Sequence, residues 1–377
     1  MHFTTRPGII NRDAGTSNQN NHLFTTVFAE GAAMSNANTN PKLHNATWPG
    51  VVGKGPDSEP CLELEEMLRL TSNANVEGAR FDGFDLFLSA PHFDCSNMAA
   101  EIYRIVNYCD EYQLEVGSLV ANVWAGSAIG SDDARDTFLR EVELGCMAGS
   151  KLHALGVRPS GCVRIDSSCS VSAWAADPEA NTRQIVETFK TACNIADSYG
   201  EKLALEGEVC WGGMHSWKRC VEILEAVDRP RTLGFQADMS HTNLFLLGAN
   251  APEDRLLPDD FQWGQTEVYD EAYKKMTDAL RPWTIDFHVA QNDGTVFGSG
   301  AHDKTGRHCL PNDPNGKLDI PKYARYWLTE NGAPTRKLRH ICWDGCMFPN
   351  SAMQDPATWN AVLGAMKAVR ETCGWQD

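Results

Sequence analysis

Four residues that can bind a metal ion stand near the carboxyl ends of four successive segments with strand-like alternation. They are Glu206, Asp238, His288 and Asp344. In each segment polar side chains alternate with apolar ones, so the polar set shares one face. Carboxylates gathered in one cleft repel each other and are costly to desolvate, and a divalent cation relieves both effects. This mixture of carboxylate and imidazole groups suits Mn²⁺, Mg²⁺, Co²⁺ or Zn²⁺, so the pattern predicts one such ion.

Each of these residues also has a simpler interpretation. Glu206 or Asp344 alone is typical of one half of an ion pair with a nearby Arg or Lys, and His288 alone is typical of a hydrogen-bonded core histidine. The convergence of four strand ends favours the metal site. Other polar residues on the same strand faces, among them Asp286 and His340, are expected to converge at the same mouth.

The elements that would position these residues alternate along the chain. From residue 42 onward, short strand-like segments precede longer helix-like segments, which predicts a parallel sheet built of βα units. Eight such units are what a closed (β/α)₈ barrel needs. The predicted strands are 43–48, part of 78–88, 115–123, 161–166, 202–209, 232–239, 284–290 and 338–343. The predicted helices are 62–73, 98–112, 133–149, 182–199, 216–227, 268–280, 321–329 and 358–372, with long loops, 248–265 and 292–318, after the sixth and seventh strands.

Length and composition agree with one α/β barrel domain. The chain has 377 residues, of which 42% are hydrophobic, enough for a sizeable core. We interpret residues 42–377 as the barrel and residues 1–41 as a polar extension, which lacks the basic and apolar regions of a signal peptide. No stretch approaches 18 apolar residues, so we expect no membrane-spanning helix and no membrane partner.

Charge and cysteine usage narrow the class of protein further. The formal net charge of −17 produces a surface field that repels phosphate, which argues against a nucleic-acid partner. The 13 cysteines are scattered and form no Cys-x-x-Cys pair, which is typical of a reducing compartment. We therefore expect a cytoplasmic protein.

The motifs of the second half resemble those of the xylose isomerase-like sugar isomerase/epimerase superfamily. Residues 203–206 are similar to its Leu-Ala-Leu-Glu strand, and residues 236–241 contain a similar Asp-x-x-His motif. Residues 287–294 resemble its His-x-x-x-Asn-[Asn/Asp] segment, and residues 306–319 resemble its His-Leu-Pro-x-Gly-x-Gly-x-x-Asp stretch. The resemblance is strongest over residues 200–345, and the barrel order extends it over the predicted domain.

Carried over residue by residue, the resemblance implies metal ligation by the four strand-end residues named first, with Mn²⁺ as the ion expected first. It also implies that His241 contacts a substrate hydroxyl or carbonyl. Glu206 matches the register of the family's ligand. Glu208, on the same face and nearer the mouth, is either a rival ligand or the free acid/base. Asp344 stands where the family usually has a Glu that is both ligand and acid/base, so its catalytic role stays open.

Substrate contacts depart from the family pattern. Gly294 stands where relatives often carry a substrate-binding Arg, and the long seventh loop carries His302 and His308, which are expected either to bind substrate or to brace the loop. Arg164, on the polar face of the fourth predicted strand, is expected to contact substrate as well.

Tryptophans near predicted strand ends suit a carbohydrate, because sugar rings stack on indoles through their C–H faces. The alternative is that these indoles only fill space between strands and helices. The four residues concerned are Trp48, Trp124, Trp211 and Trp283.

The resemblance implies proton abstraction next to a carbonyl of a small-molecule sugar, through an enediolate that a metal ion stabilises. Return of the proton gives isomerisation or epimerisation, which is the leading hypothesis. Loss of a leaving group gives the alternative, a lyase or hydratase acting on 3-keto-glycosides. A non-catalytic sugar-binding barrel is a remote alternative, and the charge disfavours a nuclease of the endonuclease IV type. By analogy with the family we expect a homodimer or homotetramer.

Overall fold

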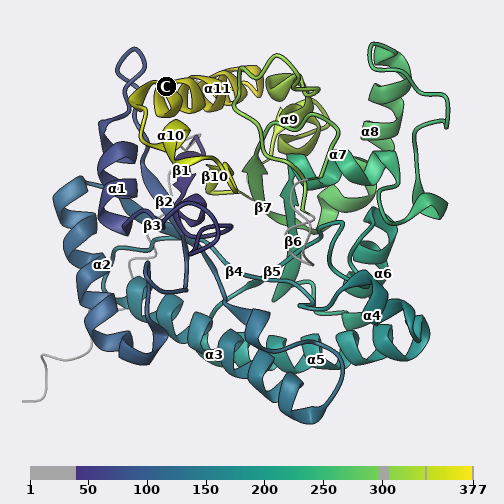
Figure 1. Ribbon diagram of the computed structural model, residues 1–377, viewed down its shortest axis with the longest axis horizontal. Coiled ribbons are helices and arrows are strands. Elements are labelled where there is room, and N and C mark those ends of the chain that lie inside the picture. The colour runs from purple at the N-terminus through teal and green to yellow at the C-terminus, as the bar shows by residue number, and fades with distance from the viewer. Residues whose placement is uncertain (1–39, 297–304, 336–337, 376–377) are drawn as a thin grey trace, which may run out of the picture. The chain divides into compact units, whose positions relative to one another are not determined.

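Short apolar segments form eight parallel strands, and these close into a barrel because the first strand pairs with both the second and the last. The strands are β1 (Lys42–Ala46), β2 (Gly83–Phe87), β3 (Glu115–Val120), β4 (Val163–Ile165), β5 (Leu203–Glu206), β6 (Leu233–Asp238), β7 (Thr284–Val289) and β10 (His340–Trp343). The computed structural model describes residues 40–296, 305–335 and 338–375, and Figure 1 shows the strands inside a ring of helices. The predicted (β/α)₈ barrel is confirmed. Residues 1–39 of the predicted extension lie outside the described residues.

Helices connect the strands, and capping residues set their ends. They are α1 (Leu64–Asn73), α2 (Met98–Tyr112), α3 (Asp132–Ala154), α4 (Val171–Ala175), α5 (Pro178–Tyr199), α6 (Trp217–Val227), α7 (Met239–Leu247), α8 (Thr266–Leu280), α9 (Ile320–Leu328), α10 (Asn350–Met353) and α11 (Pro356–Thr372). The hydroxyls of Ser131 and Ser216 accept a hydrogen bond from the backbone N–H three residues later and so cap α3 and α6. A short antiparallel pair, β8 (Thr329–Glu330) and β9 (Ala333–Pro334), lies outside the barrel.

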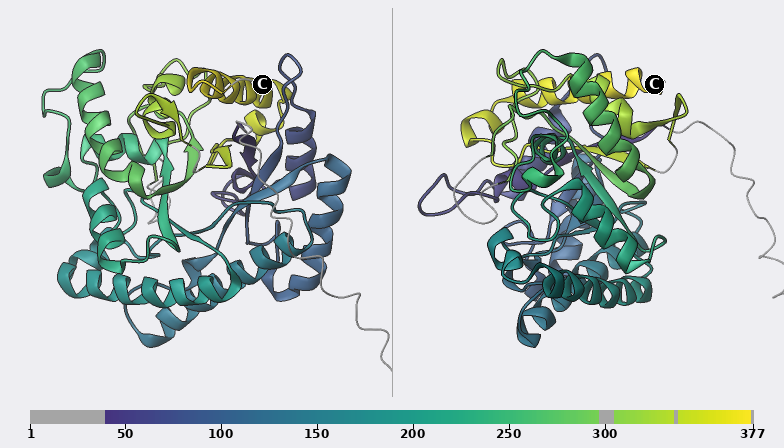
Figure 2. Two further views of the ribbon diagram at one scale, coloured as in Figure 1. Left: turned by 180° about the vertical axis from the view of Figure 1, so that it is seen from behind. Right: turned by 90° about the vertical axis from the view of Figure 1, so that its right-hand side faces the viewer.

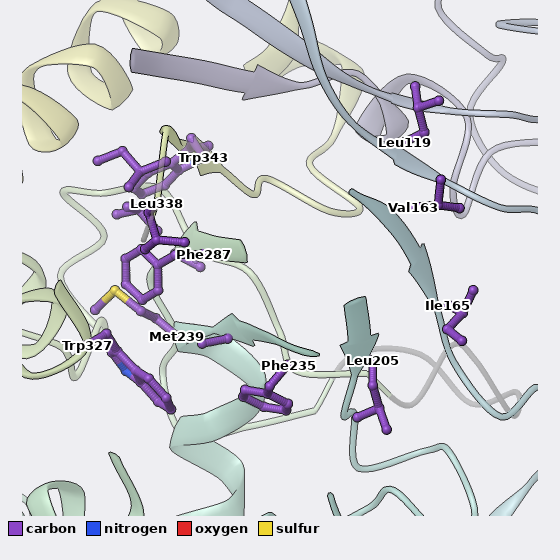
Figure 3. Packing of buried hydrophobic residues seen from close by; sticks show 14 of the residues in the cluster. Leu119, Val163, Ile165, Leu205, Phe235, Met239, Phe287, Trp327, Leu338 and Trp343 are labelled. Atoms are coloured by element: carbon purple, nitrogen blue, oxygen red, sulfur yellow. The ribbon is translucent and has the colours of Figure 1, made fainter. Parts of the chain in front are cut away.

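The apolar face of each strand packs against the surrounding helices. Phe235 of β6 and Phe287 of β7 both approach the indole of Trp327 in α9, with ring centroids 6.3 and 6.4 Å apart, and Figure 3 shows the three side chains together. Full burial of each such side chain stabilises the fold by about 1.5–3 kcal/mol. Further along the ring, α3 and α5 pack side by side (Figures 1 and 2). Because alternate strand residues face opposite ways, the remaining side chains point into the barrel.

Several element boundaries differ from the prediction, and two of these differences lie beside the strand-end residues. Strand β6 runs directly into α7, which the sequence pattern did not predict; the predicted helix 268–280 corresponds to α8. Residues 239–246 are all buried, so α7 has no face exposed to solvent and its sequence shows no amphipathic pattern. Strand β5 ends at Glu206, three residues before the predicted end. At the next residue, Gly207, a Cβ atom would lie 2.4 Å from Cys220 Sγ.

Part of the inward polar set lies deeper than predicted. Asp286 and His340 do not reach the mouth but join His44, Asp85 and Ser118 in what we call the interior polar cluster. His44 Nδ1 lies 2.9 Å from Asp85 Oδ1, His340 Nε2 lies 3.2 Å from Asp85 Oδ2, and the Ser118 hydroxyl donates to Asp286 Oδ1 at 3.1 Å. The reason is the strand rise of about 3.3 Å per residue, which carries residues two to four positions before a strand end well below the rim.

No helix in the described part of the chain is long and apolar enough to cross a membrane. The 13 cysteines all lie within the described residues, and none forms a disulfide.

Replacement of Gly117 by Ala is expected to destabilise the barrel, because the new Cβ would lie 2.3 Å from Asp85 Oδ1 and 2.4 Å from His44 Nδ1. Both neighbours are fully buried and bonded to each other, so neither gives way freely. We expect a loss of about 1–3 kcal/mol in the free energy of unfolding, measured by urea titration. Gly364→Ala in α11 is the matched control: no atom lies within 4 Å of its Cβ position, so stability should stay equal or rise. Equal stability of both variants would contradict the packing described for Gly117.

Candidate metal centre and active site

The four strand-end residues meet at one rim of the barrel. Glu206 ends β5, Asp238 ends β6, His288 lies in β7, and Asp344 directly follows β10. One oxygen or nitrogen atom from each lies within 4.8 Å of the corresponding atoms of the other three. All four side chains are buried. The chain therefore brings together the set that the sequence pattern singled out.

The two carboxylate oxygens of Asp238 have different surroundings. Its Oδ1 accepts hydrogen bonds from the backbone N–H groups of Ser240 at 2.6 Å and His241 at 3.1 Å, so it caps α7. Its Oδ2 has no hydrogen-bond partner among the described residues and faces His288 Nδ1 at 3.6 Å. The two histidines His241 and His308 outweigh burial and hold the pKa of Asp238 well below its usual range.

The two carboxylate oxygens of Asp344 also differ in their surroundings. Its Oδ1 accepts hydrogen bonds from the indole N–H of Trp48 at 3.0 Å and the backbone N–H of Cys346 at 2.7 Å. Its Oδ2 lies 3.5 Å from His288 Nδ1. Burial raises the pKa of Asp344, but His308 and His288 outweigh it and the net pKa is lowered. Each aspartate thus keeps one oxygen fixed by donors and turns the other toward the same point.

His288 is held between the rim and the interior polar cluster. Gln236 donates to Glu206 Oε1 at 3.0 Å and lies against the His288 ring, 2.6 Å from Nδ1. On the other side, His288 Nε2 lies 3.9 Å from Asp286 Oδ2. A carboxylate behind an imidazole is a common way to orient a metal-binding histidine.

Arg164 of β4 supplies positive charge between two glutamates. Its Nη2 atom contacts Glu206 Oε2, lies 2.6 Å from Glu208 Oε1 and is 3.6 Å from Asp166 Oδ2. Burial raises the pKa of Glu206 well above its usual range, and Arg164 only partly offsets this effect. Burial acts on Glu208 too, but His241 and Arg164 outweigh it and the pKa of Glu208 is lowered. Two neighbouring carboxyls therefore have pKa values pushed in opposite directions, which is typical of a proton-transfer site.

Glu208 lies beyond the end of β5 and outside the group of four. Its Oε2 accepts a hydrogen bond from the Thr305 hydroxyl and lies 3.8 Å from His241 Nε2. Burial lowers the pKa of His241, and the adjacent carboxylates restore it only in part. Of the two glutamates left open by the sequence, Glu206 is thus the one next to Asp238 and His288, and Glu208 stands between Arg164 and His241.

A pocket opens beside these residues, with about 480 Å³ of empty space when the part open to solvent is counted. Trp48, Trp124 and Trp211 line it, and the indole N–H of Trp124 donates to Asp166 Oδ2 at 2.9 Å. Trp283 does not line it: this residue precedes β7 and so lies at the opposite end of the parallel strands, which corrects the expectation for that residue. The remaining lining is charged on one part and apolar on another, the apolar part being Val52, Phe87, Val120 and Cys346.

Of the two histidines predicted in the long loop after β7, His302 and His308, the structure describes only one. His302 lies outside the described residues. The His308 side chain is buried, and its Nε2 lies 3.6 Å from Asp238 Oδ2 and 3.8 Å from Asp344 Oδ2. Burial lowers the pKa of His308, but the carboxylates of Asp344 and Asp238 outweigh it and raise the pKa to about 9.

A family model described as the xylose isomerase-like TIM barrel matches residues 74–325, more than half of the chain. The chain belongs to this family. The membership confirms the resemblance that the strand-end motifs carried. No curated protein sequence matches the chain.

Solved structures share the fold of this xylose isomerase-like barrel. A D-tagatose 3-epimerase-like protein is 14% identical with a TM-score of 0.57, and the match covers 88% of this chain and 98% of that one. The apo form of 3-keto-D-glucoside 4-epimerase from E. coli is 12% identical with a TM-score of 0.50, covering 86% and 98%. A barrel of the same name from Mycobacterium smegmatis, in complex with magnesium, is 11% identical with a TM-score of 0.55, covering 89% and 98%. At these identities the likeness concerns the fold.

The residues at the rim of this xylose isomerase-like barrel fit a divalent cation. Asp238 Oδ2 is buried and unpartnered within the described chain, and the carboxylates of Glu206 and Asp344 point at the same place. Arg164 is the one arginine or lysine among the described residues that line the pocket, so negative charge is in excess. Mixed carboxylate and imidazole donors suit Mg²⁺, Mn²⁺, Co²⁺ and Zn²⁺ alike, so the donor set leaves the metal open.

Sequence reasoning did not find three features of the site. Gln236 shares a strand face with Asp238, so its position was readable, but an amide gave no signal of a role. Thr305 comes from the long seventh loop, which has no periodicity to follow. The apolar part of the pocket is built from Val52, Phe87 and Val120, which look like ordinary core residues in the sequence.

The interior polar cluster beneath His288 predicts a pH dependence of stability. Burial lowers the pKa of His44, but the hydrogen-bonded carboxylate of Asp85 and the nearby carboxylate of Glu115 outweigh it and raise the pKa from 6.5 to about 9. A raised pKa means that the folded state binds the proton more tightly. The stabilisation is therefore complete below pH 6.5 and is lost as the pH rises through about 9. Its size is on the order of 3 kcal/mol.

Urea unfolding at several pH values between 6.5 and 9 tests this prediction. His44→Gln should flatten the decline in unfolding free energy relative to the wild type, whatever its own stability. The exposed histidine of α3 provides the control, since His153→Gln should keep the wild-type slope. A slope unchanged in His44→Gln would mean that His44 is not the proton-binding group.

Proposed function

We propose that the chain is a divalent-metal-dependent sugar isomerase or epimerase, which transfers a proton at a carbon next to a carbonyl. The observation that carries the proposal is the placement of Glu208 in the pocket beside the four possible metal ligands: it is buried, held by Arg164 and Thr305, and outside the group of four. Similarity to structures named as a tagatose 3-epimerase-like protein and a 3-keto-D-glucoside 4-epimerase supports the class of reaction.

In this proposal Glu206, Asp238, His288 and Asp344 hold the cation. When bound, it would polarise the substrate carbonyl and stabilise the enediolate that forms on loss of the neighbouring proton. Asp344 is assigned to binding and not to proton transfer, because Trp48 and Cys346 already occupy its Oδ1 and its Oδ2 faces His288.

Glu208 is proposed as the group that takes and returns the proton. Its lowered pKa keeps it ionised near neutral pH, and Arg164 and Thr305 fix its two oxygens. His241 lies 3.8 Å from Glu208 and is mainly neutral because burial lowers its pKa, so it can donate a hydrogen bond to a substrate hydroxyl. Trp48, Trp124 and Trp211 provide ring faces for the C–H groups of a sugar.

A lyase acting on a 3-keto-glycoside is the second candidate, and the apolar part of the pocket favours it. Val52, Phe87 and Val120 offer no hydrogen bond to a sugar hydroxyl but suit an apolar leaving group. Incubation with free ketoses and, separately, with 3-keto-glucosides separates the two reactions. New isomers from free ketoses support the isomerase or epimerase, whereas release of the leaving group without isomers selects the lyase.

Metal content is the direct test of the site. Purified protein should hold one divalent ion per chain by elemental analysis, and Glu206→Gln and Asp344→Asn should each lower that content because each replaces a carboxyl ligand by an amide. Glu187→Gln, an equal change on the exposed face of α5, should leave it unaltered. Full metal retention in both site variants would refute the proposed ligand set. Sugar binding that survives chelation, with no turnover before or after it, would favour the non-catalytic sugar-binding barrel.

Glu208→Gln should separate proton transfer from metal binding. Loss of a general base typically lowers the rate about 10²–10⁴-fold, so kcat should fall by this factor while KM changes little. Metal content should match the wild type, since Glu208 lies outside the group of four. If metal content falls with kcat, Glu208 is a ligand and the roles assigned to the two glutamates are wrong.

A further inference from the structure

His308 is a buried histidine for which the proposed reaction has no role. Its side chain is fully enclosed, and both ring nitrogens lack a hydrogen-bond partner among the described residues. A buried imidazole with neither nitrogen bonded is costly, because at least one nitrogen carries a proton to donate and the desolvated group gains nothing in return. Each of these nitrogens therefore lacks a partner that the described residues could supply.

His308 and His288 hold matching positions around two carboxylate oxygens. Asp238 Oδ2 lies 3.6 Å from His288 Nδ1 and 3.6 Å from His308 Nε2. Asp344 Oδ2 lies 3.5 Å from His288 Nδ1 and 3.8 Å from His308 Nε2. Each of the two carboxylate oxygens therefore faces both imidazoles, and His308 forms groups of possible ligands with Asp238 and His241 and with Asp344 and Cys346. All four atoms come from buried side chains.

The backbone on both sides of His308 is fixed to the barrel. Arg307 accepts hydrogen bonds at its carbonyl from Asn292 Nδ2 at 2.8 Å and from the hydroxyl of Ser240 at 3.3 Å. The N–H of Cys309 donates to the carbonyl of Gln291 at 2.8 Å. These contacts tie the residue to the loop after β7 and to the start of α7, the two elements next to His288 and Asp238. The position of the imidazole is therefore set by the fold.

We propose that His308 is a fifth protein ligand of the divalent ion, bound through Nε2. The proposal rests on the metal site of the proposed function and deepens it. A fifth protein ligand would leave fewer positions on the ion for the oxygens of a substrate. A second imidazole also shifts the preference from Mg²⁺ toward transition metals such as Mn²⁺, Co²⁺ and Zn²⁺. A histidine that only bound substrate would produce neither effect.

Proton NMR of the Co²⁺-loaded full-length protein counts the ligating imidazoles, because each contributes one strongly shifted, exchangeable N–H signal. We expect two such signals in the wild type and one in both His308→Gln and His288→Gln. His153→Gln, at the exposed histidine of α3, is the control and should keep both signals. His241 shares a group of possible ligands with Asp238 and His308, so His241→Gln is compared as well. Loss of a signal in His241→Gln with none lost in His288→Gln would overturn the proposal. Affinity for Co²⁺, from chelator competition, should weaken by about tenfold or more in His308→Gln.

The outcomes separate this proposal from the proposed function. One shifted signal in the wild type that His288→Gln removes would overturn the role of His308 and leave the metal site standing. Two signals that persist in His308→Gln would overturn it as well. Failure of the wild type to bind Co²⁺, Mn²⁺ or Zn²⁺ would overturn both. The wild-type count is decisive by itself if His308→Gln does not fold, and His308→Asn provides a second variant.

Discussion

Burial of negative charge at one rim is the constraint on which the site depends. A closed barrel of parallel strands brings the C-terminal ends of all strands to the same rim. Acidic residues at the ends of several strands therefore lie close to one another. Removing a carboxylate from water costs several kcal/mol unless partners replace the lost solvent. Five carboxylates with at most 6% exposure meet here: Asp166, Glu206, Glu208, Asp238 and Asp344.

Neighbouring strand ends supply most of the partners. Arg164 forms ion pairs with Glu206 and Glu208. The indole N–H of Trp124 donates a hydrogen bond to Asp166, and that of Trp48 donates to one oxygen of Asp344. Backbone N–H groups at the start of α7 donate hydrogen bonds to one oxygen of Asp238. These donors fix the orientation of each acid. They leave one oxygen of Asp238 without a hydrogen-bond donor among the described residues, and one oxygen of Asp344 facing His288. These two oxygens mark the centre of the site.

Period-two alternation and βα order make the barrel and its four strand-end residues predictable from the sequence. Glu206, Asp238, His288 and Asp344 were found because each stands at the end of a strand whose inner face is polar. Alternation gives the face of a side chain but not its depth, so the lower position of Asp286 was missed. The fully buried α7 has no amphipathic pattern. The position of His308 in the seventh loop depends on hydrogen bonds between distant residues, which no local pattern encodes.

The double role of Asp238 has a consequence for how the barrel responds to its ion. One carboxylate both starts α7 and faces the proposed cation, so binding and helix order share a single group. An N-cap of this kind is worth about 0.5–2 kcal/mol, and protonation of the carboxylate weakens it. Nearby histidines already hold the pKa of Asp238 well below its usual range, so the carboxylate stays ionised and keeps the first turn of α7, with His241, capped even without an ion. The site would therefore take up an ion without first having to order the helix that bears the substrate-facing histidine.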